Sequence, residues 1–331
     1  MKVSSRSKRV TARDVALASG VSQSTVSFVL NSTPGQTIPD HTRDRVLEAA
    51  IRLGYVPNAS AQILAGGQSR FVIIAMQDLP FGDIVSSFEQ ATVDDLLQQG
   101  FIPVLAPAHG SGDTSSLLAL AATLRPAAVI TAAPPSEADQ QKLRQSGNPR
   151  ILSTFSSHAA LLEPFTATGE AQAQHLATRG HGEVGFVRTA DPSLARLVDA
   201  RMRGVEHGCT NSGVTFAGSI DWTDDLDSLA RSLAVFLLDH PRTTAVAAYN
   251  DQVALAVMAA ARKIGLDIPS KLAVVGADNL PMSRLVSPTL SSAAYEVEAR
   301  AQRNFSDLIL SGAEMDRAVR VKIAVVERES T

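Results

Sequence analysis

The chain has 331 residues, of which 45% are hydrophobic and 19% charged, a composition typical of a folded protein with two or three domains. The longest unbroken apolar run, Val253 to Ala261, is about half the length that spans a bilayer, and no apolar segment follows the basic N-terminal residues. The single cysteine, Cys209, excludes an internal disulfide and a zinc-binding spacing. We therefore expect a cytoplasmic protein without a membrane segment.

The overall net charge of −3 conceals an uneven distribution of charge along the chain. Residues 1–70 have nine Lys and Arg against four Asp and Glu, which gives +5, and residues 71–331 therefore carry 21 basic and 29 acidic groups, or −8. A small basic module joined to a larger acidic one indicates a polyanionic partner such as nucleic acid. The alternative is a basic N-terminus that is simply solvated.

Two short helices with a tight turn between them are predicted first. The first covers 12–18, with Thr11 as its N-cap and Asp14 placed to complete a capping box. A second helix over 22–30 follows Gly20. Two short helices joined by a glycine-containing turn are typical of a helix-turn-helix.

The second helix is amphipathic, because Val26, Val29 and Leu30 form one apolar stripe. Its other face carries the residues that we expect to contact phosphates and base edges, namely Gln23, Ser24, Ser27 and Phe28. A third helix is predicted over 40–53, ending at Gly54. A plain three-helix bundle is the alternative interpretation.

Beyond the basic module, Pro57-Asn58 interrupts the chain, and the helix-capable segment 59–65 is too short to be stable alone in water. Strands are then expected at 71–76, 102–106, 127–131 and 150–154, alternating with helices at 84–99, 115–124 and 137–146. A second series has strands at 183–187, 244–249, 272–276 and 321–326 and helices at 193–208, 226–239, 252–264 and 296–310. Such alternation predicts parallel sheets with helices on both faces and ligands at the carboxyl ends of the strands.

Enzyme motifs are scarce in this chain. Residues 180–185 do have the spacing G-x-G-x-x-G, but they precede a predicted strand, whereas a dinucleotide fingerprint links a strand to a helix. Neither a P-loop nor a G-x-S-x-G motif occurs, and the seven histidines show no metal-ligand spacing. We expect a protein that is not an enzyme and holds no cofactor or metal.

The segments VTARDVALASGVSQSTVSFVLN and TRDRVLEAAIRLGYVPNASAQIL closely resemble the N-terminus of the LacI/GalR family of bacterial transcription regulators. The resemblance extends over the whole chain and weakens after residue 70. It implies a small all-α helix-turn-helix DNA-binding domain over 1–57 and a hinge helix and linker over 58–70. It also implies an α/β effector-binding and dimerisation domain over 71–331, with two doubly wound lobes similar to periplasmic sugar-binding proteins. The first lobe would comprise about 71–157 and 290–317, and the second about 165–286 and 320–331.

The same resemblance implies a set of DNA-contacting positions, with a hinge leucine, Leu64, entering the minor groove. Phe28 stands where the family usually has a guanine-reading arginine, so a different operator is expected. Pro39 replaces a serine that usually precedes the third helix. The expected DNA-binding residues are Thr11, Ser22, Gln23, Ser24, Thr25, Ser27, Phe28, Asn31, Tyr55, Asn58 and Leu64.

Effector-binding residues are also implied by the resemblance. The R-x-x-G motif at Arg201 would project a guanidinium into the cleft, and Asp278 would accept two hydrogen bonds from the ligand. Asp251 is expected to cap the helix over 252–264, and Trp222 either stacks on the ligand or packs in the core. The full expected set is Phe81, Phe155, Arg201, Trp222, Asn250 and Asp278.

Together these features predict a homodimeric regulator, a repressor, that binds a pseudo-palindromic operator in double-stranded DNA under the control of a small-molecule effector. The effector is expected to be a sugar or sugar derivative, with a purine or nucleoside as the alternative. A sugar-binding protein without a DNA role is a further alternative. The chain ends five residues after Val326 without a leucine heptad, so we expect dimers rather than tetramers.

Overall fold

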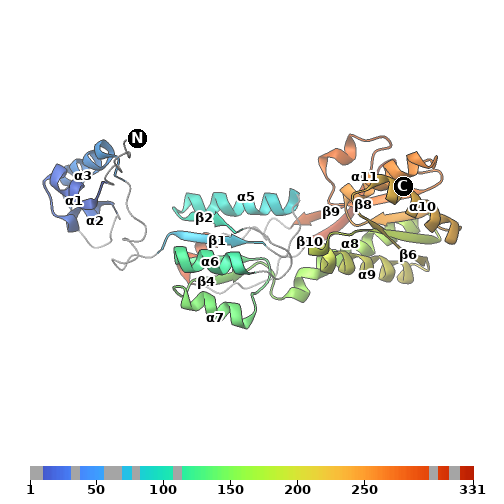
Figure 1. The fold of residues 1–331 in the computed structure, drawn as a ribbon, viewed down its shortest axis with the longest axis horizontal. Helices are drawn as coiled ribbons and strands as arrows, with labels where there is room; N and C mark the ends of the chain where they lie inside the picture. The colour runs from blue at the N-terminus through green and yellow to red at the C-terminus, as the bar shows by residue number, and fades with distance from the viewer. Residues whose placement is uncertain are drawn as a thin grey trace, which may run out of the picture. The chain divides into compact units, whose positions relative to one another are not determined.

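The structure is a computed structural model that describes residues 10–30, 38–55, 69–76, 83–106, 114–297, 305–312 and 321–331. The chain divides into two compact units, Met1–Ser69 and Arg70–Thr331, which are described separately below (Figure 1). No helix in these described ranges has the length and apolar character needed to cross a bilayer.

The described part of the first unit contains three helices, α1 (Ala12–Ser19), α2 (Gln23–Leu30) and α3 (Asp40–Leu53). The predicted capping box is present, because the backbone N–H of Thr11 donates to the Asp14 carboxylate at 2.8 Å. Gly20 and Gly54 end α1 and α3 with positive φ angles of 66° and 62°. Seven side chains form the core between the helices: Val15, Ala16, Val26, Val29, Val46, Ala49 and Ala50.

The second unit begins with a four-stranded parallel sheet in the order β2-β1-β3-β4, which we call the first lobe. Its strands are β1 (Phe71–Ala75), β2 (Ile102–Leu105), β3 (Ala128–Thr131) and β4 (Arg150–Ser153). The helices between them are α5 (Asp83–Gln98), α6 (Ser115–Leu124) and α7 (Glu137–Gln145). A later segment, α12 (Phe305–Ser311), returns to this lobe, where Ser306 Oγ donates to Asp95 of α5 at 2.7 Å.

The second lobe is built on a six-stranded sheet in the order β10-β9-β8-β7-β5-β6, in which only β10 is antiparallel to its neighbour. Its strands are β5 (Glu183–Thr189), β6 (Thr215–Trp222), β7 (Ala245–Ala248), β8 (Ala273–Ala277), β9 (Ser291–Val297) and β10 (Val321–Val326). Its helices are α8 (His158–Thr178), α9 (Ala195–Asn211), α10 (Leu226–Asp239) and α11 (Asp251–Lys263), with the short 3₁₀ segments η1 (Pro192–Leu194) and η2 (Pro281–Arg284). The doubly wound α/β architecture that the sequence predicted is therefore confirmed.

Three elements differ from the sequence-based prediction. Helix α8 and strand β6 were not predicted. The expected helix at 296–310 is wrong at its start, because Ser291–Val297 forms β9; Phe305–Ser311 is helical, and residues 298–304 lie outside the described residues. Strand β9 pairs with β8 and β10 in the second lobe. The expected assignment of residues 290–317 to the first lobe is thus wrong for β9.

Helices α8 and α9 pack with their backbones in unusually close contact. A Cβ atom on Gly204 would clash with the carbonyl oxygen of Thr166, and one on Gly169 would clash with the carbonyl oxygen of Arg201. The glycine of the R-x-x-G motif is therefore required by packing. This contact brings α9, which carries Arg201, against the helix that contributes Phe165 to the core of the second lobe.

Candidate functional site

The exposed face of α2 is the first candidate site. Ser22, Gln23 and Ser24 are exposed at the start of α2, while Val26 and Val29 on its other side are buried against α1 and α3. Ser22 is the N-cap, since its hydroxyl accepts from the backbone N–H of Thr25 at 3.1 Å. The helix thus presents short polar groups at its N-terminal end, which suits contact with phosphates and base edges.

The remaining expected DNA contacts fall into three groups. Thr11 is exposed, whereas Tyr55 is half-buried against the three-helix core. Thr25, Ser27 and Phe28 are partly exposed, and the described side chains that pack on the core do not include Phe28. Asn31, Asn58 and Leu64 lie outside the described residues.

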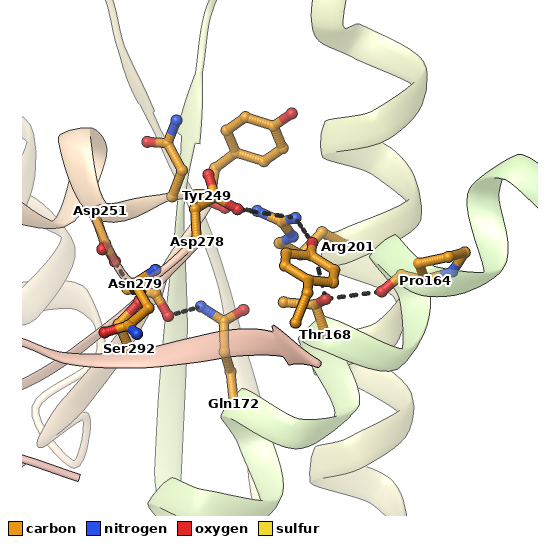
Figure 2. A network of polar contacts seen from close by, with 12 residues as sticks. Pro164, Thr168, Gln172, Arg201, Tyr249, Asp251, Asp278, Asn279 and Ser292 are labelled. Carbon is orange, nitrogen blue, oxygen red and sulfur yellow. Dashed lines mark hydrogen bonds and ion pairs between the residues drawn. The ribbon is translucent and has the colours of Figure 1, made fainter. Parts of the chain in front are cut away.

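The second candidate site lies at the carboxyl ends of the strands of the second lobe, where a buried arginine is the central group (Figure 2). Arg201 is 1% exposed, and its Nη1 donates to the carbonyl oxygen of Tyr249. Its Nη2 donates to the hydroxyl of Tyr295 at 2.5 Å and lies 3.9 Å from Oδ1 of Asp278. The sequence predicted an arginine that projects into a cleft, but the structure places it in the interior on protein partners.

Aromatic rings and a hydroxyl chain complete the surroundings of Arg201. The guanidinium carbon lies 5.2 Å from the ring centre of Phe165 and 4.8 Å from that of Tyr249, within cation–π distance of both. The hydroxyl of Thr168 bridges the Tyr295 hydroxyl at 3.0 Å and the carbonyl oxygen of Pro164 at 2.7 Å. Burial by itself disfavours the charge of Arg201, but Tyr295 and Asp278 outweigh burial and raise the pKa of its guanidinium.

Asp278 follows β8 in a backbone conformation that few residues adopt. Asp278 and Asn279 have φ angles of 93° and 51°, and the Asp278 side chain is 25% exposed. The Asn279 N–H donates to Ser292 Oγ at 2.9 Å, which fastens the turn to β9. The structure therefore brings Asp278 and Arg201 together, as the resemblance implied, and leaves Asp278 partly accessible at the sheet edge.

Asp251 stabilises this turn through hydrogen bonds and does not cap helix α11. The N-cap of α11 is Asn250, whose Oδ1 accepts from the Val253 N–H at 2.9 Å, so the expected capping role of Asp251 is wrong. Asp251 is fully buried, and its carboxylate accepts from the Leu280 N–H at 2.7 Å and from the hydroxyls of Ser283 and Ser292. Burial raises the pKa of Asp251 to about 6 in spite of these three donors.

A second arginine, Arg188 near the end of β5, lies in the same sheet. Its Nη2 is 3.1 Å from Asp199 of α9, and its Nε is 3.3 Å from Asp221 at the end of β6. The sequence analysis did not single out Arg188, Tyr249 or Tyr295. The chain has three tyrosines, and the convergence of two of them on Arg201 depends on strand pairing that the sequence pattern did not reveal.

The other expected effector residues that the structure describes lie in different parts of the fold. Trp222 at the end of β6 packs against the core of the second lobe, and the Asn250 side chain is engaged at the start of α11. Phe155 is buried in the first lobe and borders a cavity of about 430 Å³. Phe81 lies outside the described residues.

In the first lobe, a cavity of about 380 Å³ lies where β1 and β3 end. It is bordered by Ala75, Thr131, Ser136, Asp139 and His158, among others. Strand order reverses between β1 and β3, and ligands of doubly wound sheets bind at such a switch point. Within the described ranges, no cluster of His, Cys, Asp and Glu has the geometry to hold a metal ion.

Comparison with known proteins agrees with this architecture. Residues 11–58 match the model for bacterial regulatory proteins of the lacI family, and residues 173–331 match the model for a periplasmic binding protein-like domain. The regulator GalS of Salmonella typhimurium is 28% identical, with 92% of this chain and 90% of that protein aligned. Catabolite control protein A of Priestia megaterium is 26% identical over 89% of this chain and 91% of that protein.

A solved structure has the same fold over nearly the full length. The lac repressor dimer bound to operator and the anti-inducer ONPF superimposes with a TM-score of 0.74, at 23% identity, and covers 98% of this chain and 99% of that one. The lacI-family match lies within the first unit, and the periplasmic binding protein-like match lies within the second unit. The chain is thus similar in both of its units to transcriptional regulators of the LacI/GalR family.

Proposed function

We propose that this protein is a repressor that binds a pseudo-palindromic operator as a homodimer and responds to a small-molecule effector. It acts by binding and not by catalysis. The observation that carries the proposal is the exposed polar start of α2, held on a buried apolar core within a segment of net charge +5. Two copies would place two such helices in successive major grooves.

Effector control follows from two states that differ in affinity for DNA. A ligand at the strand ends near Asp278 and Arg201 shifts the equilibrium only if it binds one state more tightly than the other. In this proposal the hinge segment around Leu64 enters the minor groove in the DNA-bound state, and the effector disfavours that state. A sugar or sugar derivative fits a site with a carboxylate acceptor and aromatic faces, and a nucleoside is the alternative.

The proposal is tested by selection from a random double-stranded DNA library with the full chain. The expected result is a two-fold symmetric motif whose half-sites are separated by about one helical turn, or roughly 10 base pairs. Affinity for this motif should fall with salt at a log–log slope of about −0.9 for each phosphate that is neutralised. The variant Gln23→Ala should alter the enriched motif, whereas Ile51→Ala, an exposed truncation on α3, should not.

The opposite results would contradict the proposal. If no sequence is enriched and DNA retention does not depend on salt, the three-helix unit is not a DNA-binding domain. The two-lobed unit would then support only a ligand-binding protein without a DNA role.

A further inference from the structure

Arg188 has the donor groups that anionic ligands require, but two protein carboxylates already lie within ion-pair distance of its guanidinium, although its Nε makes no hydrogen bond among the described residues. Two different Asp side chains, Asp199 and Asp221, approach its Nη2 and Nε at 3.1 and 3.3 Å, and the side chain of Arg188 is 28% exposed. A guanidinium with two carboxylate partners carries no net attraction for a third anion. Arg188 is therefore closed to a phosphate or carboxylate on a ligand.

Arg201, the other arginine at these strand ends, is also poorly available to an anionic ligand, for a different reason. Its two Nη atoms donate to the Tyr249 carbonyl and the Tyr295 hydroxyl, and Asp278 balances its charge from 3.9 Å. Its Nε is buried and has no hydrogen-bond partner among the described residues. An anion could reach this guanidinium only by displacing Tyr295 and by entering beside the Asp278 carboxylate. Both changes oppose the binding of a negatively charged group.

Helix N-termini often bind anions, and four of those along the strand ends have a side-chain cap, whereas those of α6 and α9 do not. Ser136, Ser157, Asp225 and Asn250 accept hydrogen bonds from the first turns of α7, α8, α10 and α11. A capped first turn has fewer free N–H groups to offer to a phosphate. The described part of these four capped helices thus offers no ready anion site.

The charges of the connecting loops also disfavour the binding of an anionic ligand. The segments between each of the second-lobe strands β5 to β8 and the helical segment that follows contain no Lys or Arg. They contain four aspartates: Asp191, Asp224, Asp225 and Asp278. Because ligands of doubly wound sheets bind among these loops, an anionic ligand would meet a field of its own sign.

At these strand ends, the Asp278 carboxylate and the Tyr249 hydroxyl can each interact with an uncharged ligand. The Asp278 carboxylate is partly exposed and can accept from hydroxyl groups. The hydroxyl of Tyr249 is buried, has no hydrogen-bond partner among the described residues, and lies within electrostatic range of Asp278. Both groups suit a ligand that donates and accepts through hydroxyls.

We propose that the strand-end site of the second lobe selects an uncharged, hydroxyl-bearing ligand and excludes ligands with a phosphate or carboxylate group. The inference rests on the proposed function only in taking this ligand as the effector. The carboxylates Asp199 and Asp221 act as the selectivity element, because they occupy the one partly exposed arginine at the strand ends that the structure describes.

The test uses inorganic phosphate as the probe and the full chain without DNA. The melting temperature is measured against phosphate concentration at constant ionic strength, and the rise seen in an Arg188→Met variant is subtracted to remove binding elsewhere. The expected difference is zero for the wild type. The double variant Asp199→Asn/Asp221→Asn should gain a saturable rise, because it frees the Arg188 guanidinium at unchanged side-chain size.

A matched control is the double variant Asp239→Asn/Asp267→Asn, which removes the same amount of charge from exposed positions of the same lobe that lie outside these loops. It should behave as the wild type. A saturable Arg188-dependent rise in the wild type would overturn the proposal, as would a response of Asp199→Asn/Asp221→Asn no larger than that of the control. If the double variant unfolds early, the single variant Asp221→Asn gives the same readout. Since no DNA is present, a failure of operator binding cannot produce either result.

Discussion

Arg201 on α9 donates through Nη2 to the hydroxyl of Tyr295 on β9, at 2.5 Å and across 94 residues of sequence. The contact joins the R-x-x-G motif to the strand that follows the Asp278 turn. Arg201 therefore holds the strand ends together in addition to any role in ligand binding. A substitution there changes the stability of the second unit as well as its response to an effector.

Replacement of Arg201 by alanine should destabilise the second unit by about 3 kcal/mol or more, because it removes the buried guanidinium that contacts Asp278, Tyr295 and the Tyr249 carbonyl. Urea denaturation of the full chain measures this loss. Arg203→Ala is the matched control, since Arg203 is exposed on the same helix and should change the free energy of unfolding by less than about 0.5 kcal/mol. Equal effects of the two variants would show that Arg201 is not a structural residue.

Loss of the hydroxyl should change the stability of the second unit differently at the two tyrosines around Arg201. Tyr295→Phe removes the acceptor of Arg201 and the partner of Thr168, which should cost about 1–3 kcal/mol. Tyr249→Phe removes a buried hydroxyl with no partner among the described residues, so stability should be unchanged or slightly higher. Thermal or urea unfolding compares the pair directly. A larger loss for Tyr249→Phe would contradict the hydrogen-bond assignment.

Gly204 should tolerate no side chain, in contrast to most helical glycines. An alanine would normally favour the helix by up to about 1 kcal/mol, but its Cβ would meet the Thr166 carbonyl of α8. We expect Gly204→Ala to destabilise the second unit by about 1–3 kcal/mol. Gly182→Ala, at an exposed position with no atom within 4 Å of the added Cβ, should be close to neutral. Similar stabilities of the two variants would show that α8 and α9 can separate at low cost.

Elements with strong local signals were predictable from the sequence. Helices α6 and α10 and strand β10 have the predicted bounds, and α1 and α3 end at the glycines that the sequence indicated. Helix α8 was missed because Pro164 and Gly169 lie inside it, and its packing on α9 outweighs their low helix propensity. Strand β9 was missed because SSAAYEV lacks an apolar alternation and is stabilised by pairing on both sides.

The candidate site was only partly predictable for the same reason. Arg201 and Asp278 came from the family resemblance, and the structure brings them to 3.9 Å. The partner Tyr295 lies on the missed strand β9, so its contact with Arg201 had no local signal in the sequence. Asp251 could be read as a helix cap, but its donors Ser283 and Ser292 come from other segments of the fold.

Asp251 should make stability depend on pH between about 4 and 6. Its folded-state pKa of about 6 lies above the ordinary 3.8, so the folded state binds the extra proton and stability falls as pH rises through this window. The charged form costs up to about 3 kcal/mol relative to the protonated form. In Asp251→Asn this component should be absent. In Ser283→Ala, which lacks a donor that lowers the folded-state pKa, the upper end of this window should move to higher pH.

The measurement is the free energy of unfolding of the wild type and both variants from pH 4 to pH 8. The difference between the wild type and Asp251→Asn isolates the contribution of this carboxyl from that of every other titrating group. A difference that does not vary with pH would mean that Asp251 stays charged throughout this range in the folded state.

Phe28 should determine which base is favoured at one position of each operator half-site. It is partly exposed on α2, next to Ser27 on the face that carries Gln23 and Ser24, and a phenyl ring can make only apolar contacts such as that with a thymine methyl. Phe28→Arg supplies a bidentate donor, so guanine should become favoured at that position by about 1–3 kcal/mol. Library selection with both proteins measures the shift, and Phe28→Leu, which stays apolar, is the control. If all three select the same base there, the side chain at position 28 does not contact the base edges, and the specificity of α2 depends on its other exposed side chains, such as Gln23 and Ser24.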